Sequence, residues 1–126
     1  MRVPDELLYS ADHEWIRIDG DLATIGVTDY AQDSLGDVVY VDIPKTGTRV
    51  MLSESFSEVE STKAVSEIYA PVAGEVVEVN ETLKDEPERL NRDPYGDGWL
   101  CVIRMADAAA VEHLMAADAY RSLIGI

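Results

Sequence analysis

One lysine stands apart from the other residues of this chain that could do chemistry. Lys63 lies in the run Glu60-Ser61-Thr62-Lys63-Ala64, between two short alternating stretches around Val59 and Val65. Alternating stretches joined by a short polar segment are typical of a β-hairpin, so the pattern predicts Lys63 at the tip. A lysine exposed on a rigid turn can be acylated by another enzyme. The alternative is an ordinary surface lysine that only keeps the fold soluble.

The remaining residue types give little support for catalysis or metal binding. His13-Glu14 could pair a base with a carboxylate, but a general base needs a substrate or nucleophile in reach, and the sequence indicates neither. Two histidines and one cysteine cannot supply the three or four ligands of a zinc site. Cys101 lies in an apolar run, which is typical of a buried, inert thiol. We therefore predict no catalytic residues, no metal site and no enzymatic activity.

Composition and charge narrow the function classes further. A chain of 126 residues with 47% hydrophobic residues is long enough to form one domain (1–126) with a core of its own. The formal net charge of −15 disfavours nucleic acid and anionic membrane surfaces as partners, because phosphate groups would be repelled. The same charge would favour binding to partner proteins with basic surfaces. The alternative is that the charge only keeps the protein soluble.

The start of the chain and its hydropathy bear on the compartment. No stretch is long and apolar enough to span a membrane, and Met-Arg-Val-Pro-Asp-Glu-Leu-Leu contains no signal-peptide core. We expect a cytoplasmic protein.

The elements that must position Lys63 are mostly strands. Residues 9–18 are typical of a polar loop that enters a strand, and the dipeptide Asp19-Gly20 after them predicts a two-residue turn of a hairpin that continues over 22–27. Thr28 stands at the N-cap position of a short helix over 29–35, which Gly36 ends.

A short internal repeat flanks the lysine hairpin. The segment 36–42 (G-D-V-V-Y-V-D) recurs as 74–80 (G-E-V-V-E-V-N), at an offset of 38 residues. Period two predicts that Val39, Val41 and Ile43 share one face in the first copy, and Val77 and Val79 in the second. A repeated strand-and-turn unit with a hairpin between its copies suggests two sheets related by a pseudo-two-fold axis.

The second half of the chain mixes strand and helix signals. Asn80 is a candidate cap for a short helix over 81–85, and the turn-rich stretch 87–98 has room for at most one helical turn. The apolar run 99–105 predicts a strand. The Ala-rich stretch 107–124 predicts two short helices that pack on the sheets.

Several of these segments resemble one known family, the H protein of the glycine cleavage system, which has the biotinyl/lipoyl-carrier fold. The resemblance extends from Tyr9 to Leu123. It is carried by H-E-W-I (13–16), residues 26–44, E-V-E-S-T-K-A (58–64), residues 70–80 and N-R-D-P-Y-G-D-G-W-L (91–100). The M-K-M tip usual in biotin carriers is absent. Thr62 and Ser57 depart from the valine and glycine that are frequent in the family.

The resemblance implies a fold and a mechanism. The fold would be a flattened, barrel-like sandwich of two sheets, mainly β, with short peripheral helices and a C-terminal helical segment. Lipoate would be attached to Lys63, with Glu60, Ser61, Thr62 and Ala64 recognised around it, and Glu14 is a candidate residue of a cleft that shelters the arm. The partners would be a lipoate-attaching enzyme, a PLP-dependent glycine decarboxylase, a tetrahydrofolate-dependent aminomethyltransferase and dihydrolipoyl dehydrogenase.

Two other functions remain open from the sequence. The chain could be a lipoyl carrier or lipoate donor for 2-oxoacid dehydrogenase complexes, or an unmodified interaction domain that has kept the fold. Transfer assays with each set of partners separate the first from glycine cleavage, and the intact mass of the protein decides the second.

Overall fold

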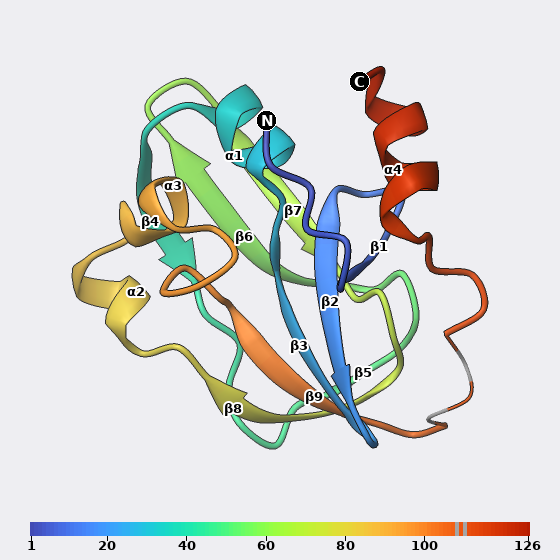
Figure 1. The fold of residues 1–126 in the computed structure, drawn as a ribbon. Helices are drawn as coiled ribbons and strands as arrows, with labels where there is room; N and C mark the ends of the chain where they lie inside the picture. Colours follow the sequence, from blue (N-terminus) through green and yellow to red (C-terminus); the bar gives the residue numbers. More distant parts are fainter. Residues whose placement is uncertain (108, 110) are drawn as a thin grey trace.

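Two antiparallel sheets form the body of the molecule in the computed structural model, which describes residues 1–107, 109 and 111–126 (Figure 1). The larger sheet has six strands in the order β1 (Leu8–Tyr9), β2 (Glu14–Asp19), β3 (Leu22–Val27), β9 (Cys101–Met105), β8 (Gly74–Val79) and β5 (Arg49–Val50). The smaller sheet has the order β4 (Val38–Asp42), β6 (Ser55–Ser61) and β7 (Val65–Tyr69). The predicted mainly-β, two-sheet architecture is confirmed.

Short helices lie around the sheets, at the positions drawn in Figure 1. They are α1 (Asp29–Leu35), α2 (Thr82–Asp85), α3 (Arg89–Arg92) and α4 (Ala117–Ile124). None of the helices in the described ranges is long and apolar enough to cross a membrane. Because these helices are only four to eight residues long, the fold is stabilised mainly by the pairing of strands and by the side chains between the layers.

The predicted start and end of α1 are confirmed. The hydroxyl of Thr28 accepts the backbone N–H of Ala31 at 3.2 Å, as an N-cap residue does. Gly36 ends the helix with φ of 81°, a conformation that favours glycine. These two residues fix where α1 sits between β3 and β4, beside the lysine hairpin.

Two apolar clusters hold the layers together. One contains Ile16, Ala23, Ile25, Val50, Ala70, Val72, Val76, Cys101, Ile103 and Met105. The other lies under the three-stranded sheet and contains Val27, Leu35, Val38, Val41, Val59, Ile68, Leu83, Leu90 and Leu100. Phe56 packs against both clusters, which makes the hydrophobic core continuous beneath the lysine hairpin.

The internal repeat differs from its prediction in the same way in both copies. The pairing of β4 with β6 shifts register between Val38 and Tyr40, and the pairing of β8 with β9 shifts between Val76 and Glu78. The extra residue of each bulge, Val39 or Val77, sits at the same point of the 38-residue repeat. The prediction that Val39 shares a face with Val41 is wrong, because the bulge leaves Val39 53% exposed.

The bulge also moves the buried position in the second copy. Val76 is fully buried, whereas Val77 and Val79 are half-buried. Side chains alternate strictly between the two faces only where a strand pairs without a bulge. The prediction that Val77 and Val79 share one face is therefore wrong. The matching bulges support the pseudo-two-fold relation that the repeat suggested.

Two further predictions need correction. The first two-residue turn is Gly20-Asp21 rather than Asp19-Gly20, because Asp19 pairs with Leu22. Asn80 does not cap α2: its amide donates to the carbonyls of Asp97 and Trp99 at 2.8 Å, and the N-cap residue is Glu81. The buried Asn80 side chain thus joins the end of β8 to the loop before β9.

Among its described residues, the C-terminal stretch contains one helix rather than the two that were predicted. Helix α4 is present, but the described residues before it form turns, and positions 108 and 110 lie outside the described residues. The backbone of Met115 exchanges hydrogen bonds with that of Tyr9 at 2.7 and 2.8 Å. Pairing of this segment with β1 thus overrides the helix propensity of its alanines.

Candidate functional site

Lys63 lies on the turn between β6 and β7, as the alternating pattern predicted. Ser61 builds this turn. Its hydroxyl oxygen accepts the backbone N–H groups of Lys63 at 3.3 Å and Ala64 at 3.1 Å, and its own N–H donates to the Ala64 carbonyl at 2.8 Å. The N–H of Thr62 donates to the Asp37 carbonyl at 3.0 Å, which ties the tip to the α1–β4 connection. The backbone of the turn is therefore fixed while the lysine side chain is exposed.

The lysine side chain passes over the glycine that ends α1. A Cβ atom added at Gly36 would lie 3.3 Å from Cε of Lys63. Lys63 has no ion-pair partner within the described residues, whereas Lys84 pairs with Glu81 at 2.8 Å. Lys63 is therefore an exposed lysine on a fixed backbone.

A cavity of about 300 Å³ adjoins the hairpin. Ala64 and Val65, the two residues after the lysine, form part of its wall. The other lining residues are Asp12, His13, Val27, Tyr30, Ala31, Ser34, Leu35, Ser66 and Ile68. The lining is mostly apolar, with Val27, Leu35 and Ile68, and also has polar groups such as His13 and Ser34, a composition typical of sites that take a small organic group.

His13 forms part of the polar side of the cavity and has an unusual backbone conformation. Its φ is 67°, in the left-handed region that non-glycine residues rarely adopt. Its Nδ1 atom lies 2.9 Å from the hydroxyl of Tyr120, and its ring lies 4.9 Å from that of Tyr30. Burial lowers the pKa of His13 from its ordinary value.

Glu14 lies behind this region, at the start of β2. Its side chain is 1% exposed and is not among the lining residues of the cavity. One carboxyl oxygen lies 2.8 Å from the Ser10 hydroxyl, and the other accepts the backbone N–H of Tyr69 at 3.0 Å. Burial raises the pKa of Glu14 to about 8. The carboxyl group thus joins β2 to the end of β7.

The structure brings the predicted residues together only in part. Glu60, Ser61, Thr62, Lys63 and Ala64 are contiguous at the tip, and Glu60 stands on β6 opposite Val65. Glu14 bonds to the other end of β7 through Tyr69, away from the turn.

The cavity itself was missed by the sequence reading. Its helical wall comes from Tyr30, Ala31, Ser34 and Leu35, whose spacing places them on one face of α1. That spacing was the available signal, but it is also the ordinary pattern of a helix that packs on a sheet. Within the described residues no group of three His, Cys, Asp or Glu could hold a metal ion.

A mainly-β domain that presents an exposed lysine on a rigid hairpin turn, beside a small cavity, has the features of a carrier domain with the biotinyl/lipoyl fold. Comparison with known proteins identifies the family within this class. Residues 7–125 match the family model described as "Glycine cleavage H-protein". The chain belongs to the glycine cleavage H-protein family, whose members are carriers of lipoate rather than catalysts.

Individual relatives agree along the whole chain. The glycine cleavage system H protein of Staphylococcus carnosus is 50% identical over 125 residues, which cover 99% of each chain. A probable H protein of Haloarcula marismortui is 52% identical, over 97% of this chain and 96% of the relative. The crystal structure of an H protein from Mycobacterium marinum is similar, with a TM-score of 0.90 and 42% identity over 98% of this chain and 100% of that one.

Proposed function

We propose that this chain carries lipoate in amide linkage on Lys63 and works as the mobile carrier of glycine cleavage. In that role it takes an aminomethyl group from the glycine decarboxylase to the aminomethyltransferase and passes electrons to dihydrolipoyl dehydrogenase. The observation that carries the proposal is Lys63 itself, an exposed lysine without an ion-pair partner among the described residues, on a turn whose backbone is fixed by Ser61.

The tip residues fit attachment of lipoate. The lipoyl group supplies a dithiolane that can accept a carbon fragment and two electrons. The protein supplies position: the Ser61 hydroxyl holds the N–H groups on both sides of the lysine side chain, and Thr62 anchors the tip to Asp37. We infer that the attaching enzyme recognises this shape through Glu60, Ser61, Thr62 and Ala64. Amide formation removes the positive charge of Lys63 and leaves the hairpin wholly acidic.

The cavity beside the tip is the proposed shelter for the arm. Its wall begins at Ala64 and Val65, and its apolar side, with Val27, Leu35 and Ile68, suits an aliphatic chain. Exclusion of water from this space would protect a hydrolysable cargo. Glu14 would support the shelter from behind, because its bond to the Tyr69 amide positions the last residue of β7.

The partners are proposed as the other proteins of glycine cleavage and a lipoate-attaching enzyme, acting on a single domain (1–126) in the cytoplasm. The outer face of the three-stranded sheet carries acidic side chains that could contribute to the docking of these partners. Asp42, Glu58 and Glu67 stand directly opposite one another across β4, β6 and β7. Like charges in this position cost stability. A row of carboxylates near the lysine is complementary to a basic partner surface.

Reconstituted transfer tests the proposal. Lipoylated protein is mixed with glycine decarboxylase, aminomethyltransferase and dihydrolipoyl dehydrogenase, and glycine-dependent release of ammonia and carbon dioxide is measured. The same preparation is offered to 2-oxoacid dehydrogenase components lacking their own lipoyl domain. Turnover with the glycine system alone supports the proposal. Turnover only with the 2-oxoacid system would replace it by the rival carrier function.

A further inference from the structure

The hydroxyl of Tyr120, on helix α4, lies between two parts of the cavity wall. It is 2.9 Å from Nδ1 of His13 and 2.7 Å from the hydroxyl of Thr28. His13 lines the cavity directly, and Thr28 caps α1, the helix whose residues form the facing wall. Tyr120 is fully buried, although it comes from the last element of the chain. The Tyr120 hydroxyl therefore bonds to His13 in one wall of the cavity and to the residue that caps the helix of the other wall.

The hydrogen-bond capacities of these groups allow a chain of bonds that runs from Thr28 through Tyr120 to His13. Thr28 Oγ1 accepts the N–H of Ala31, so its own proton is available to the oxygen of Tyr120. In this arrangement Tyr120 donates to Nδ1 of His13, which is then the unprotonated nitrogen of a neutral ring. The proton of the imidazole is thereby placed on Nε2, which has no partner among the described residues. Burial, which lowers the pKa of His13, favours the same neutral form.

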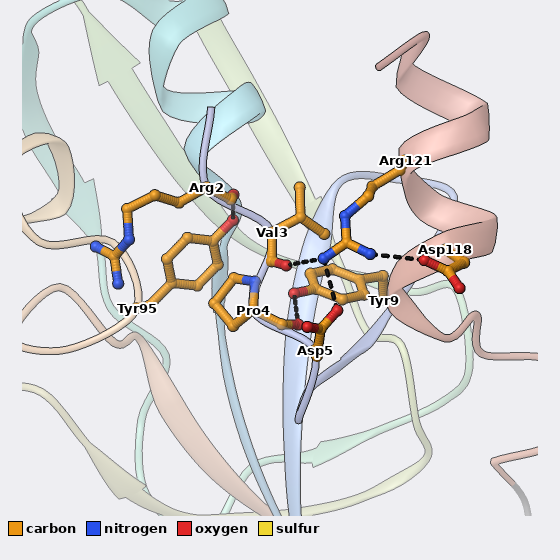
Figure 2. Close-up of polar contacts among 8 residues, drawn as sticks. All are labelled: Arg2, Val3, Pro4, Asp5, Tyr9, Tyr95, Asp118 and Arg121. Atoms are coloured by element: carbon orange, nitrogen blue, oxygen red, sulfur yellow. Dashed lines mark hydrogen bonds and ion pairs between the residues drawn. The ribbon is translucent and has the colours of Figure 1, made fainter.

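Helix α4 is itself tied to the body of the molecule next to this point. The guanidinium of Arg121 donates to the Val3 carbonyl at 2.7 Å and pairs with Asp5 and Asp118 (Figure 2). The ring of Tyr120 stacks on that of Tyr9, with centroids 4.7 Å apart. The hydroxyl of Tyr120 is thus held by its own ring packing and by the anchored helix, and it does not depend on the cavity for its position.

We propose that Tyr120 is a positioning residue for the arm cavity: its hydroxyl fixes the ring of strained His13 and the start of α1, and thereby sets the geometry of both walls. Helix α4 then acts on the carrier site from the far end of the chain. The inference deepens the proposed function and rests on it, because it gives the cavity the role of shelter for the arm. The bonds themselves can be tested in the protein without lipoate.

Tyr120→Phe is the direct test, and Tyr9→Phe is its matched control. Both variants remove one buried hydroxyl from the same stacked pair of rings. The hydroxyl of Tyr9 bonds to the Pro4 carbonyl in the N-terminal segment (Figure 2). Within the described residues it has no hydrogen bond to a lining residue of the cavity. A merely structural contribution of Tyr120 would make the two variants equivalent, whereas a positioning role separates them.

The first measurement uses unmodified protein and nitrogen-15 NMR of the histidine rings. Wild type and Tyr9→Phe should show His13 as the single Nε2–H tautomer. Tyr120→Phe should show a mixture of tautomers, with faster amide exchange in the first turn of α1. Equal spectra for all three proteins would overturn the inference, even if lipoate proved never to be attached to this chain.

The second measurement uses lipoylated protein loaded by glycine decarboxylase and then freed of it, with ammonia release followed over time. Loss of one hydrogen bond predicts release about three- to tenfold faster from Tyr120→Phe than from wild type. Tyr9→Phe should release ammonia at a rate close to that of wild type, because its ring is kept and the lost hydroxyl bonds to the Pro4 carbonyl rather than to His13 or Thr28. Identical release from both variants would contradict the positioning role. Failure of wild type to load at all would instead count against the proposed function.

Discussion

The substitution Glu14→Gln should change the pH dependence of stability in a way that follows from burial of the carboxyl group. The side chain is 1% exposed, and its pKa is raised from 4.5 to about 8. Between these pH values the folded protein keeps a proton that the unfolded chain releases. The stabilisation is complete below about pH 4.5, decreases as the pH rises, and is gone above about pH 8.

The size of this change in stability follows from the pKa shift of Glu14. Each pH unit well inside this window changes the free energy of unfolding by about 1.4 kcal/mol, and the slope flattens near its two ends, so the contribution of Glu14 falls by about 3.5 kcal/mol between pH 5 and pH 8. Glutamine keeps an oxygen to accept the N–H of Tyr69 and cannot ionise. The stability of Glu14→Gln relative to wild type should therefore rise by this amount over the window.

Urea unfolding of both proteins at pH 5, 6, 7 and 8, followed by circular dichroism, measures the effect. Asp12→Asn serves as the control, because Asp12 is a nearby exposed carboxylate that raises the pKa of Glu14 only as a minor cause. Its difference from wild type should vary little with pH. A constant difference between Glu14→Gln and wild type across the series would show that Glu14 is ionised in the folded state and would refute this reasoning.

Three further predictions concern the carrier site and its support. The first moves the lysine by one residue, by combining Lys63→Arg with Thr62→Lys or with Ala64→Lys. Lipoylation of both variants should fall on the order of a hundredfold, while their circular dichroism stays unchanged. Efficient modification of both variants would mean that the attaching enzyme does not recognise the geometry of the turn. The apparent KM of glycine decarboxylase for this protein should rise with ionic strength, and a flat series would mean that the acidity serves solubility only. Gly26→Ala should destabilise the fold by about 2 kcal/mol in urea unfolding, because the added Cβ would lie 2.5 Å from the Trp15 ring, and wild-type stability would disprove this close approach.

The sequence correctly predicted the elements whose signal lies within one short stretch of the chain. The lysine hairpin, the hairpin of β2 and β3, and both ends of α1 follow from alternation, turn residues and caps. Each of these depends on neighbours in the chain, so the residues that decide them lie within the same short stretch. The repeat also predicted two related sheets, which the matching register shifts at Val39 and Val77 support.

The errors arise where distant segments decide the outcome. The bulges at Val39 and Val77 depend on how β4 and β8 pair with β6 and β9, which alternation within one strand cannot reveal. The turns before α4 form because Met115 pairs with Tyr9, more than a hundred residues earlier in the chain.

The cavity wall could not be predicted from the sequence either, for the same reason. It joins His13, α1 and β7, and its support comes from Tyr120 at the other end of the chain. No pattern within one segment indicates that these residues meet. The proposed site residue, Lys63, could be placed from the sequence because its position on the turn follows from the pattern of its own hairpin.

The central claim is that Lys63 carries the lipoyl group, and peptide mapping by mass spectrometry tests it most directly. The protein is produced in a host that attaches lipoate, digested, and examined at each of its lysines, which are Lys45, Lys63 and Lys84. The account predicts one lipoyl group per chain, on Lys63, and none in Lys63→Arg. A lipoyl group on Lys45 or Lys84, or a chain that stays unmodified beside a lipoylated control protein in the same cells, would contradict it.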